Sequence, residues 1–306
     1  MTGKQPVILK SGRLLDFSGP ALVMAIVNCN DDSFYAPSRA LFEEAAEKAL
    51  AAEEDGASII DFGAESSRPG SSYINEETEL KFLIPVITAF RKRSSLPVSV
   101  DTRKSGVARA AMEAGADIIN DISALRDDPD MAQVCAEYGA AIVLMHMKGI
   151  PLTMQESGES YTNLFAELKV FFNDAVNRAL EAGIARDKII LDPGIGFGKN
   201  YENNIEIMRR MRELASMREL AGLRGSLNLA ETPGNDYPLL IGLSRKKFIG
   251  EMTGNGDAAE RRLAGTLAAN GAAIMGGADI IRVHDVKEHV DLAKVLFALH
   301  GGKAHL

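Results

Sequence analysis

The feature that most constrains the fold is a regular alternation between short apolar runs and longer segments that are apolar at helical spacing. The longer segments, such as RALFEEAAEKALAAEEDGA (39–57) and RKSGVARAAMEAGA (103–116), close with a glycine, the usual stop signal of a helix. The short runs are eight in number: Leu22–Val27, Ser58–Phe62, Pro97–Val100, Asp117–Ile119, Ala141–Met145, Lys188–Leu191, Pro238–Leu243 and Asp279–Val283. Eight βα units in one chain predict an α/β fold, a parallel (β/α)8 TIM barrel.

A doubly wound sheet is the alternative fold for the same alternation. Such a sheet usually has a glycine-rich fingerprint after its first strand, but Asn28-Cys29-Asn30 follows the first run here. The similar-looking GIGFGK (194–199) follows the sixth run and is a weak signal on its own. Because we find no linker and no low-complexity segment, we expect a single domain over residues 1–306, with an insertion at 222–236.

Composition and charge exclude several classes of protein. Hydrophobic residues make up 46% and charged residues 25% of the 306 residues, as in soluble globular proteins. The formal net charge of −8 argues against a nucleic-acid partner, which needs clustered Lys and Arg. The chain has no apolar run long enough to cross a membrane and no signal-peptide pattern. Cys29 and Cys135 form no disulfide framework, so we expect a cytoplasmic protein.

Each of the eight apolar runs leads into polar or charged residues. In a parallel barrel the carboxyl ends of the strands surround one cavity, where the functional site lies. The residues at these ends are Asn28, Asp61, Glu65, Asp101, Asn120, Asp121, His146, Asp192, Ser244, Arg282 and His284. Because turns follow strands in any case, we interpret Asp61, Asp121 and His146 as turn or supporting groups. Asp101 and Asp192 follow nearly uninterrupted apolar runs and are stronger candidates for binding a ligand.

The basic residues of the last two runs predict an anion site. Arg282 and His284 are two residues apart and therefore share a face of a strand. Ser244 and Lys246 repeat this spacing, and the two strands are neighbours in the quadrant where barrels commonly hold phosphate. The alternative is that these cations pair with Asp285 or Asp101. Arg68, in the loop SSRPG, is either a further ligand-binding cation or a solvated loop arginine.

Several segments together resemble the dihydropteroate synthase family. They are IIDFGAESSRPGSSYINEETELKFLIPVI, VDTRKSGVARAAMEAGADIINDIS, VLMHMKGIPLTMQ, ILDPGIGFGK, GLSRKKFIG and IRVHDV, and they occur in the family's order between Leu22 and Leu299. The resemblance implies a cytoplasmic enzyme of folate biosynthesis on a (β/α)8 barrel, usually a homodimer. Such an enzyme joins 4-aminobenzoate to 6-hydroxymethyl-7,8-dihydropterin diphosphate and releases diphosphate with the help of Mg²⁺.

The resemblance also implies roles for individual residues. The pterin would be held by Asp101, Asn120, Asp192 and Lys246, and Met145 would be a further substrate-binding residue. The diphosphate would be held by Asn28, Arg282 and His284, with Asn28 also next to Mg²⁺. The aminobenzoate site would be formed by Ser67, Arg68, Phe197 and Ser244. The catalytic residues would be Arg68, Lys246, Arg282 and His284.

The chemistry of these residue types agrees with the implied reaction. A buried carboxylate such as Asp192 can accept two adjacent N–H groups of a pterin ring. An aniline nitrogen is a poor nucleophile, so the rate gain must come from helping diphosphate to leave. Mg²⁺, Arg282 and His284 would stabilise the departing charge, and no covalent enzyme nucleophile is needed.

Two loops depart from the family pattern. The first loop usually reads Asn-Val-Thr-Pro-Asp-Ser-Phe, whereas this chain has Asn28-Cys29-Asn30-Asp31-Asp32-Ser33-Phe34. Asn30-Asp31 replaces Thr-Pro, which removes a fixed backbone dihedral and adds a negative charge that needs Mg²⁺ or Arg68 between it and a diphosphate. In the second loop Ser67 stands where Thr is common. These changes bear on substrate affinity and sulfonamide sensitivity more than on the reaction class.

Two other functions are compatible with parts of the sequence. A folate-dependent methyltransferase that passes a methyl group to a corrinoid protein would keep the pterin residues, but it does not need Ser67, Arg68 or the pair Arg282 and His284. A non-catalytic pterin-binding paralogue is supported only by the altered first loop.

Overall fold

The computed structural model describes residues 6–29, 39–65, 73–149, 161–216, 237–256 and 258–301. Its main sheet has eight parallel strands in the spatial order β8-β7-β6-β5-β4-β3-β10-β9. The strands are β3 (Leu22–Asn28), β4 (Ile59–Gly63), β5 (Val98–Asp101), β6 (Ile118–Asp121), β7 (Ala141–Met145), β8 (Ile189–Asp192), β9 (Leu240–Ile241) and β10 (Ile280–Val283). A parallel bridge between Leu191 and Leu239 joins β8 to the start of β9, so the sheet closes into the predicted barrel.

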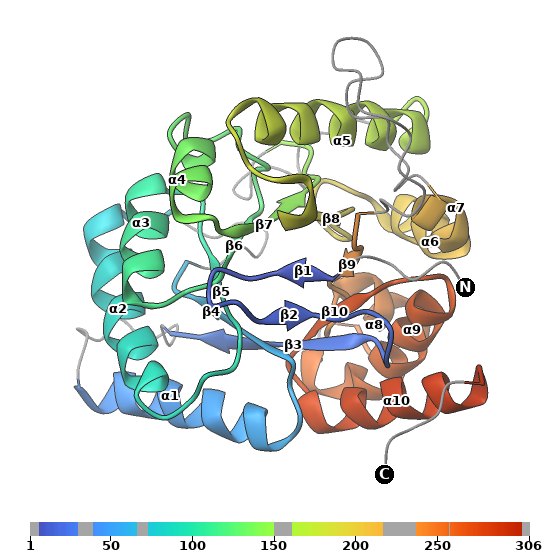
Figure 1. Cartoon of the computed structure of the whole chain (residues 1–306). Helices are drawn as coiled ribbons and strands as arrows, with labels where there is room; N and C mark the ends of the chain where they lie inside the picture. The colour runs from blue at the N-terminus through green and yellow to red at the C-terminus, as the bar shows by residue number, and fades with distance from the viewer. Residues whose placement is uncertain are drawn as a thin grey trace.

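The helices form a ring outside the barrel (Figure 1). They are α1 (Arg39–Glu54), α2 (Glu76–Arg91), α3 (Ser105–Ala114), α4 (Met131–Tyr138), α5 (Leu164–Glu181), α6 (Tyr201–Arg209), α7 (Met211–Ser216), α8 (Lys247–Thr253), α9 (Leu263–Met275) and α10 (Val286–Leu299). Short 3-10 helices occupy Arg186–Lys188 and Ala259–Arg262. The glycine stops predicted at Gly56 and Gly115 have positive φ values of 97° and 109°, as expected after a helix.

The predicted strand positions are confirmed, with shifts of one or two residues at most ends. The largest difference is the seventh run, predicted over Pro238–Leu243, where only Leu240–Ile241 is a strand. The predicted insertion at 222–236 lies outside the described residues. In the part of the chain that the structure describes, no helix has the length and apolarity needed to span a membrane.

A hairpin that the periodicity did not predict precedes the barrel. The antiparallel strands β1 (Val7–Ile8) and β2 (Leu14–Leu15) pair with each other through a tight turn at Gly12. Val7, Leu9 and Leu15 pack on residues from the amino-terminal ends of the barrel strands, such as Ile59 and Ile280. The hairpin therefore covers the amino-terminal end of the barrel, and the carboxyl end remains for the site (Figure 1).

Candidate active site

The register of the sheet brings the predicted pterin residues together at the carboxyl end of the barrel. Asp101 of β5 lies opposite Asn120 of β6, and Met145 of β7 lies opposite Asp192 of β8. Asp101, Asn120 and Asp192 are all buried, and each follows an apolar residue of its strand. Burying a carboxylate without a partner costs free energy. Each carboxylate therefore needs a cation or a hydrogen-bond donor at the carboxyl end of the barrel, which we call the barrel mouth.

Arg282 compensates one of these carboxylates, Asp101, and a further buried carboxylate, Asp61. Its Nε donates to Oδ2 of Asp61 at 2.6 Å, and its Nη2 donates to Oδ2 of Asp101 at 2.9 Å. Nδ2 of Asn120 also donates to Oδ2 of Asp61, at 3.2 Å. The alternative left open by the sequence, a pairing of Arg282 with Asp101, is therefore present, and Asp61 is a second partner. Asp61 acts as the supporting group that was predicted.

Burial dominates the electrostatics of this cluster. It raises the pKa of Asp101 to about 7, even though Arg282 favours the carboxylate. Burial works against the charge of Arg282 too, but Asp61 and Asp101 raise the pKa of that guanidinium overall. A charged ligand that enters this cluster therefore meets groups whose charges are already balanced against each other.

Asp192 and Lys246 face the neighbouring part of the mouth. Oδ1 of Asp192 accepts a hydrogen bond from the Gly194 backbone N–H at 2.7 Å. Burial raises the pKa of Asp192 to about 6, against the attraction of Lys246 and other cations. Burial and the nearby Arg282 lower the pKa of Lys246 to about 8. Its Nζ lies 4.2 Å from the centre of the Phe197 ring, within the range of a cation–π contact.

An apolar wall completes this region. Ile122, Met145, Met147 and Phe197 form a small buried cluster that is separate from the main core. Apolar side chains beside a few buried polar groups are typical of a pocket for a flat heterocyclic ligand. Among the predicted residues, Met145 and Phe197 thus lie together in one wall.

The ends of β9 and β10 converge as predicted, because the two strands are paired. The Ser244 hydroxyl lies 2.9 Å from Nδ1 of His284 and accepts the His284 backbone N–H at 3.2 Å. Arg245, between Ser244 and Lys246, has a φ of 56°, and its Nη2 donates to Oδ1 of Asp285 at 2.6 Å. The Arg245–Asp285 ion pair therefore locks the two strand ends to each other. Asp285 was predicted from the sequence as an alternative partner of Arg282, His284 or Lys246, whereas its partner here is Arg245.

Some predicted residues lie outside the described part of the chain. These are Ser67, Arg68, Asn30 and Asp31. Asn28, the predicted Mg²⁺ neighbour, ends β3 as an exposed residue. In the described ranges, no group of three or more His, Cys, Asp or Glu is arranged to hold a metal ion. A single amide oxygen suits a Mg²⁺ ion that keeps its waters and is bound mainly through substrate phosphates.

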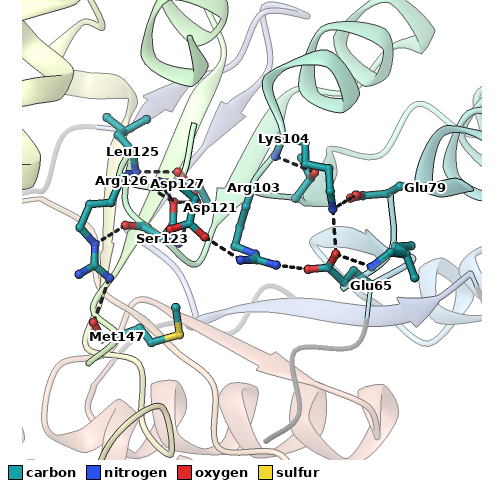
Figure 2. A network of polar contacts seen from close by, with 12 residues as sticks. Glu65, Glu79, Arg103, Lys104, Asp121, Ser123, Leu125, Arg126, Asp127 and Met147 are labelled. Atoms are coloured by element: carbon teal, nitrogen blue, oxygen red, sulfur yellow. Dashed lines mark hydrogen bonds and ion pairs between the residues drawn. The ribbon is translucent and has the colours of Figure 1, made fainter. Parts of the chain in front are cut away.

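A network of ion pairs that sequence reasoning did not single out links the ends of β4, β5 and β6 (Figure 2). Arg103 bonds both Glu65 and Asp127, the latter at 2.6 Å between Nη1 and Oδ2. Lys104 donates to Glu65 at 2.8 Å and to Glu79 of α2 at 2.6 Å. The adjacent basic residues Arg103 and Lys104, after the third apolar run, could have indicated this network. Their acidic partners are distant in sequence, so the pairing itself could not be predicted.

Asp121 is confirmed as a turn group in the same view (Figure 2). Its carboxylate accepts hydrogen bonds from the backbone N–H groups of Ser123 at 2.8 Å and Leu125 at 2.7 Å. His146 is confirmed as a supporting group, because its Nδ1 lies 2.9 Å from Nζ of Lys199. Lys199 is buried and was not predicted to have a role.

Comparison with known proteins places this geometry in a family. The family model described as "Pterin binding enzyme" matches residues 24–284. The dihydropteroate synthase of Escherichia coli K12 is 40% identical over 297 residues, which cover 97% of each chain. That of Synechocystis is 39% identical over 287 residues, covering 94% of this chain and 92% of the relative.

Solved structures agree with these matches. Yersinia pestis dihydropteroate synthase in a sulfonamide drug complex has a TM-score of 0.84 and 35% identity, over 97% of this chain and all of that one. The Xanthomonas albilineans enzyme with 4-aminobenzoic acid has a TM-score of 0.83 and 36% identity, over 98% of this chain and all of that one. The chain belongs to the dihydropteroate synthase family of pterin-binding enzymes.

Proposed function

We propose that this chain carries out the reaction of its family with the residues found at the barrel mouth. It is a dihydropteroate synthase, which condenses 4-aminobenzoate with 6-hydroxymethyl-7,8-dihydropterin diphosphate to give 7,8-dihydropteroate and diphosphate. The observation that supports our assignment of roles is the buried set of Asp101, Asn120 and Asp192 beside an apolar wall. A polar heterocycle with adjacent N–H donors fits such a surface.

The pterin ring would bind between this wall and the buried carboxylates. Asp192 would accept ring N–H groups, with Gly194 fixing one of its oxygens. Asp101 and Asn120 would bond the opposite edge of the ring. Lys246 and Phe197, already in contact, would close over the bound heterocycle.

The leaving group would be stabilised by the basic residues of β10 and the segment after β9. The amine of 4-aminobenzoate attacks the exocyclic methylene carbon, the C–O bond to diphosphate breaks with its electron pair, and the nitrogen releases a proton to solvent. Arg282, His284 and Lys246 would hold the charge that develops on diphosphate. The guanidinium of Arg282, which pairs with Asp61 and Asp101 in this structure, would then also bind the diphosphate.

Mg²⁺ would be held at the end of β3 by Asn28 together with the substrate diphosphate. When bound, it supplies positive charge to the departing phosphate oxygens. The aminobenzoate site would be formed by Ser67, Arg68, Phe197 and Ser244. We extend to this site the sulfonamide binding named for the Yersinia pestis relative, and we propose a cytoplasmic homodimer as the working form.

A corrinoid-dependent methyltransferase remains the second candidate, but Arg282 and His284 at the mouth favour a diphosphate ester as substrate. The deciding experiment measures diphosphate release from dihydropterin diphosphate with Mg²⁺, in the presence and absence of 4-aminobenzoate. Release that depends on 4-aminobenzoate and yields dihydropteroate is expected. No release in either case, with the pterin still bound, would instead support a non-catalytic pterin-binding protein.

A further inference from the structure

Lys199 is a buried cation to which the proposed mechanism assigns no role. It lies between β8 and α6, and only 3% of it is exposed. Its Nζ lies 2.9 Å from Nδ1 of His146, 2.9 Å from the Gly194 carbonyl oxygen and 3.1 Å from the Phe197 carbonyl oxygen. A longer contact of 3.3 Å reaches the carbonyl oxygen of His146. Burial of an ammonium group is expensive, so this arrangement needs a reason.

The acceptors around Lys199 match its charged form. An ammonium group has three N–H donors and no acceptor, and three acceptors lie within 3.1 Å. His146 can serve as one of them only if its ring is neutral and Nδ1 carries no proton. Burial, together with the neighbouring Lys199, Arg126 and Lys148, holds the pKa of His146 well below its usual range. The ring is therefore available as an acceptor.

The contacts of Lys199 fasten one turn to the end of another strand. The turn at 194–198 follows β8, and it lies so close to the segment after β7 that two of its positions, Gly194 and Gly198, have no room for a side chain. A Cβ on Gly194 would lie 2.0 Å from the His146 carbonyl oxygen, and one on Gly198 would lie 2.2 Å from that of Lys148. Both glycines also have positive φ values. Lys199 bonds the turn internally and links it to His146.

The fastened turn presents two groups to the pterin site. The Gly194 N–H donates to Asp192, and the Phe197 ring forms part of the apolar wall beneath Lys246. We propose that Lys199 is a positioning residue for the pterin site, whose buried ammonium fixes the 194–198 turn against the end of β7, and with it the Gly194 N–H that bonds Asp192. This inference rests on the proposed function.

The charged groups around Lys199 come from three elements. Asp192 ends β8, His146 follows β7 and Lys246 follows β9. Burial lowers the pKa of Lys199 to about 7, while Asp192 opposes that shift. In return, Lys199 is one of the cations that oppose the raised pKa of Asp192, with Lys246 and Arg282 as the others. Loss of the Lys199 charge should therefore raise the pKa of Asp192 further, and its carboxylate should form only at higher pH.

The test measures the dissociation constant of dihydropterin diphosphate with Mg²⁺ by calorimetry, from about pH 5.5 to 8.5. The variants are Lys199→Met, which removes the charge at similar length, and Lys199→Arg, which keeps the charge in a different shape. The control is Lys169→Met on α5, where the lysine is exposed. Near-UV circular dichroism and thermal unfolding establish that each variant is folded.

If the loss of the Lys199 charge raises the Asp192 pKa by about one unit, Lys199→Met is expected to weaken binding by about twofold at pH 7 and by nearly tenfold towards pH 5.5, where Asp192 is mostly protonated in the variant. The acid limb, along which affinity falls as Asp192 is protonated, should move to higher pH. Lys199→Arg should weaken binding through the altered turn but leave the acid limb in place, and Lys169→Met should match wild type. Asp101 also titrates in this pH range. It is present in the wild type and in every variant, so it does not by itself produce a difference between them.

A folded Lys199→Met variant with wild-type affinity and a wild-type acid limb would overturn the role of Lys199 and leave the proposed function intact. If Lys199→Met does not fold, Lys199→Arg decides, because wild-type affinity or a shifted acid limb in that variant contradicts the proposal. Failure of the wild-type protein to bind dihydropterin diphosphate would instead overturn the proposed function, and this inference with it.

Discussion

The two ends of the barrel differ in the side chains that they bury. At the amino-terminal end, the hairpin β1–β2 packs Val7, Leu9 and Leu15 on the apolar ends of the strands. At the carboxyl end, carboxylates and cations are buried against one another, as in the pair formed by Asp101 and Arg282. Apolar burial stabilises a fold directly, whereas buried ion pairs seldom do better than apolar replacements. The difference indicates that the first end maintains the fold and the second is retained for binding.

The pKa values at the carboxyl end express the same difference. Burial raises the pKa of Asp101 to about 7 and of Asp192 to about 6, and it lowers that of Lys246 to about 8. All three shifts favour the neutral form, so the folded protein works against these charges. A ligand with N–H donors and phosphate oxygens would stabilise the charged forms of these three side chains.

The largest effect should follow replacement of Arg282, the cation that Asp61 and Asp101 share at the carboxyl end. Arg282→Met leaves Asp61 and Asp101 without their guanidinium and removes a proposed partner of the diphosphate. We expect kcat/KM to fall by about three orders of magnitude, or about 4 kcal/mol. The matched control is Arg93→Met, whose side chain is exposed and pairs with Glu47. Steady-state assays with near-wild-type kcat/KM for Arg282→Met would remove this residue from the mechanism.

The opposite end should respond in stability and not in catalysis. Leu15→Ala deletes a side chain that is 2% exposed beneath the hairpin. We expect the free energy of unfolding to fall by about 2–4 kcal/mol, because the removed methyl groups leave a cavity. Urea titration measures this loss, and kcat of the folded fraction should remain unchanged. The comparison of the two ends fails if kcat falls in proportion to stability.

Replacement of Asp192, the residue proposed to bind the pterin ring, should have an intermediate effect. It should weaken binding of the ligand without lowering the stability of the fold. Asp192→Asn replaces a charged acceptor with an amide that presents one mismatched hydrogen. Calorimetry should show pterin diphosphate binding weakened by about 1–3 kcal/mol. The free energy of unfolding should not fall, because burial disfavours the wild-type charge. Unchanged affinity would mean that Asp192 does not bind the ring.

The smallest effect concerns the first loop, outside the described residues. If Asp31 faces the diphosphate, Asp31→Asn should lower the Mg²⁺ concentration needed for half-maximal activity by a few-fold, because repulsion near the leaving group is removed. The double variant Asn30→Thr with Asp31→Pro adds a stiffer backbone and should also lower the KM for 4-aminobenzoate. Identical Mg²⁺ titrations for wild type and Asp31→Asn would show that the charge points to solvent.

The sequence predicted the barrel well because its signal is periodic. Each strand is an apolar run that leads into polar residues, and this pattern also predicted that Asp101, Asn120 and Asp192 face one cavity. The hairpin was missed because strands of two residues, Val7–Ile8 and Leu14–Leu15, are too short to show a period.

The contacts that were missed depend on partners distant in the chain or on backbone atoms. Nothing in the sequence decides between an anion and Asp101 as the partner of Arg282, and Asp61 is 221 residues away. Lys199 was missed because its acceptors include backbone carbonyls of a glycine turn, which have no side-chain signature. The pattern could predict which residues reach the mouth, but not how their charges are shared there.

The pairing of β3 with β10 has a consequence for the order of folding. Leu22 and Ile280 are partners in one ladder, so residues near opposite ends of the chain must meet before the barrel closes. Contacts of such sequence separation form slowly, because a long loop must be closed before any stabilisation is gained. The ion pair between Arg282 and Asp61 depends on the same closure. During synthesis on the ribosome, the anion half of the site therefore cannot assemble until the last strand has emerged.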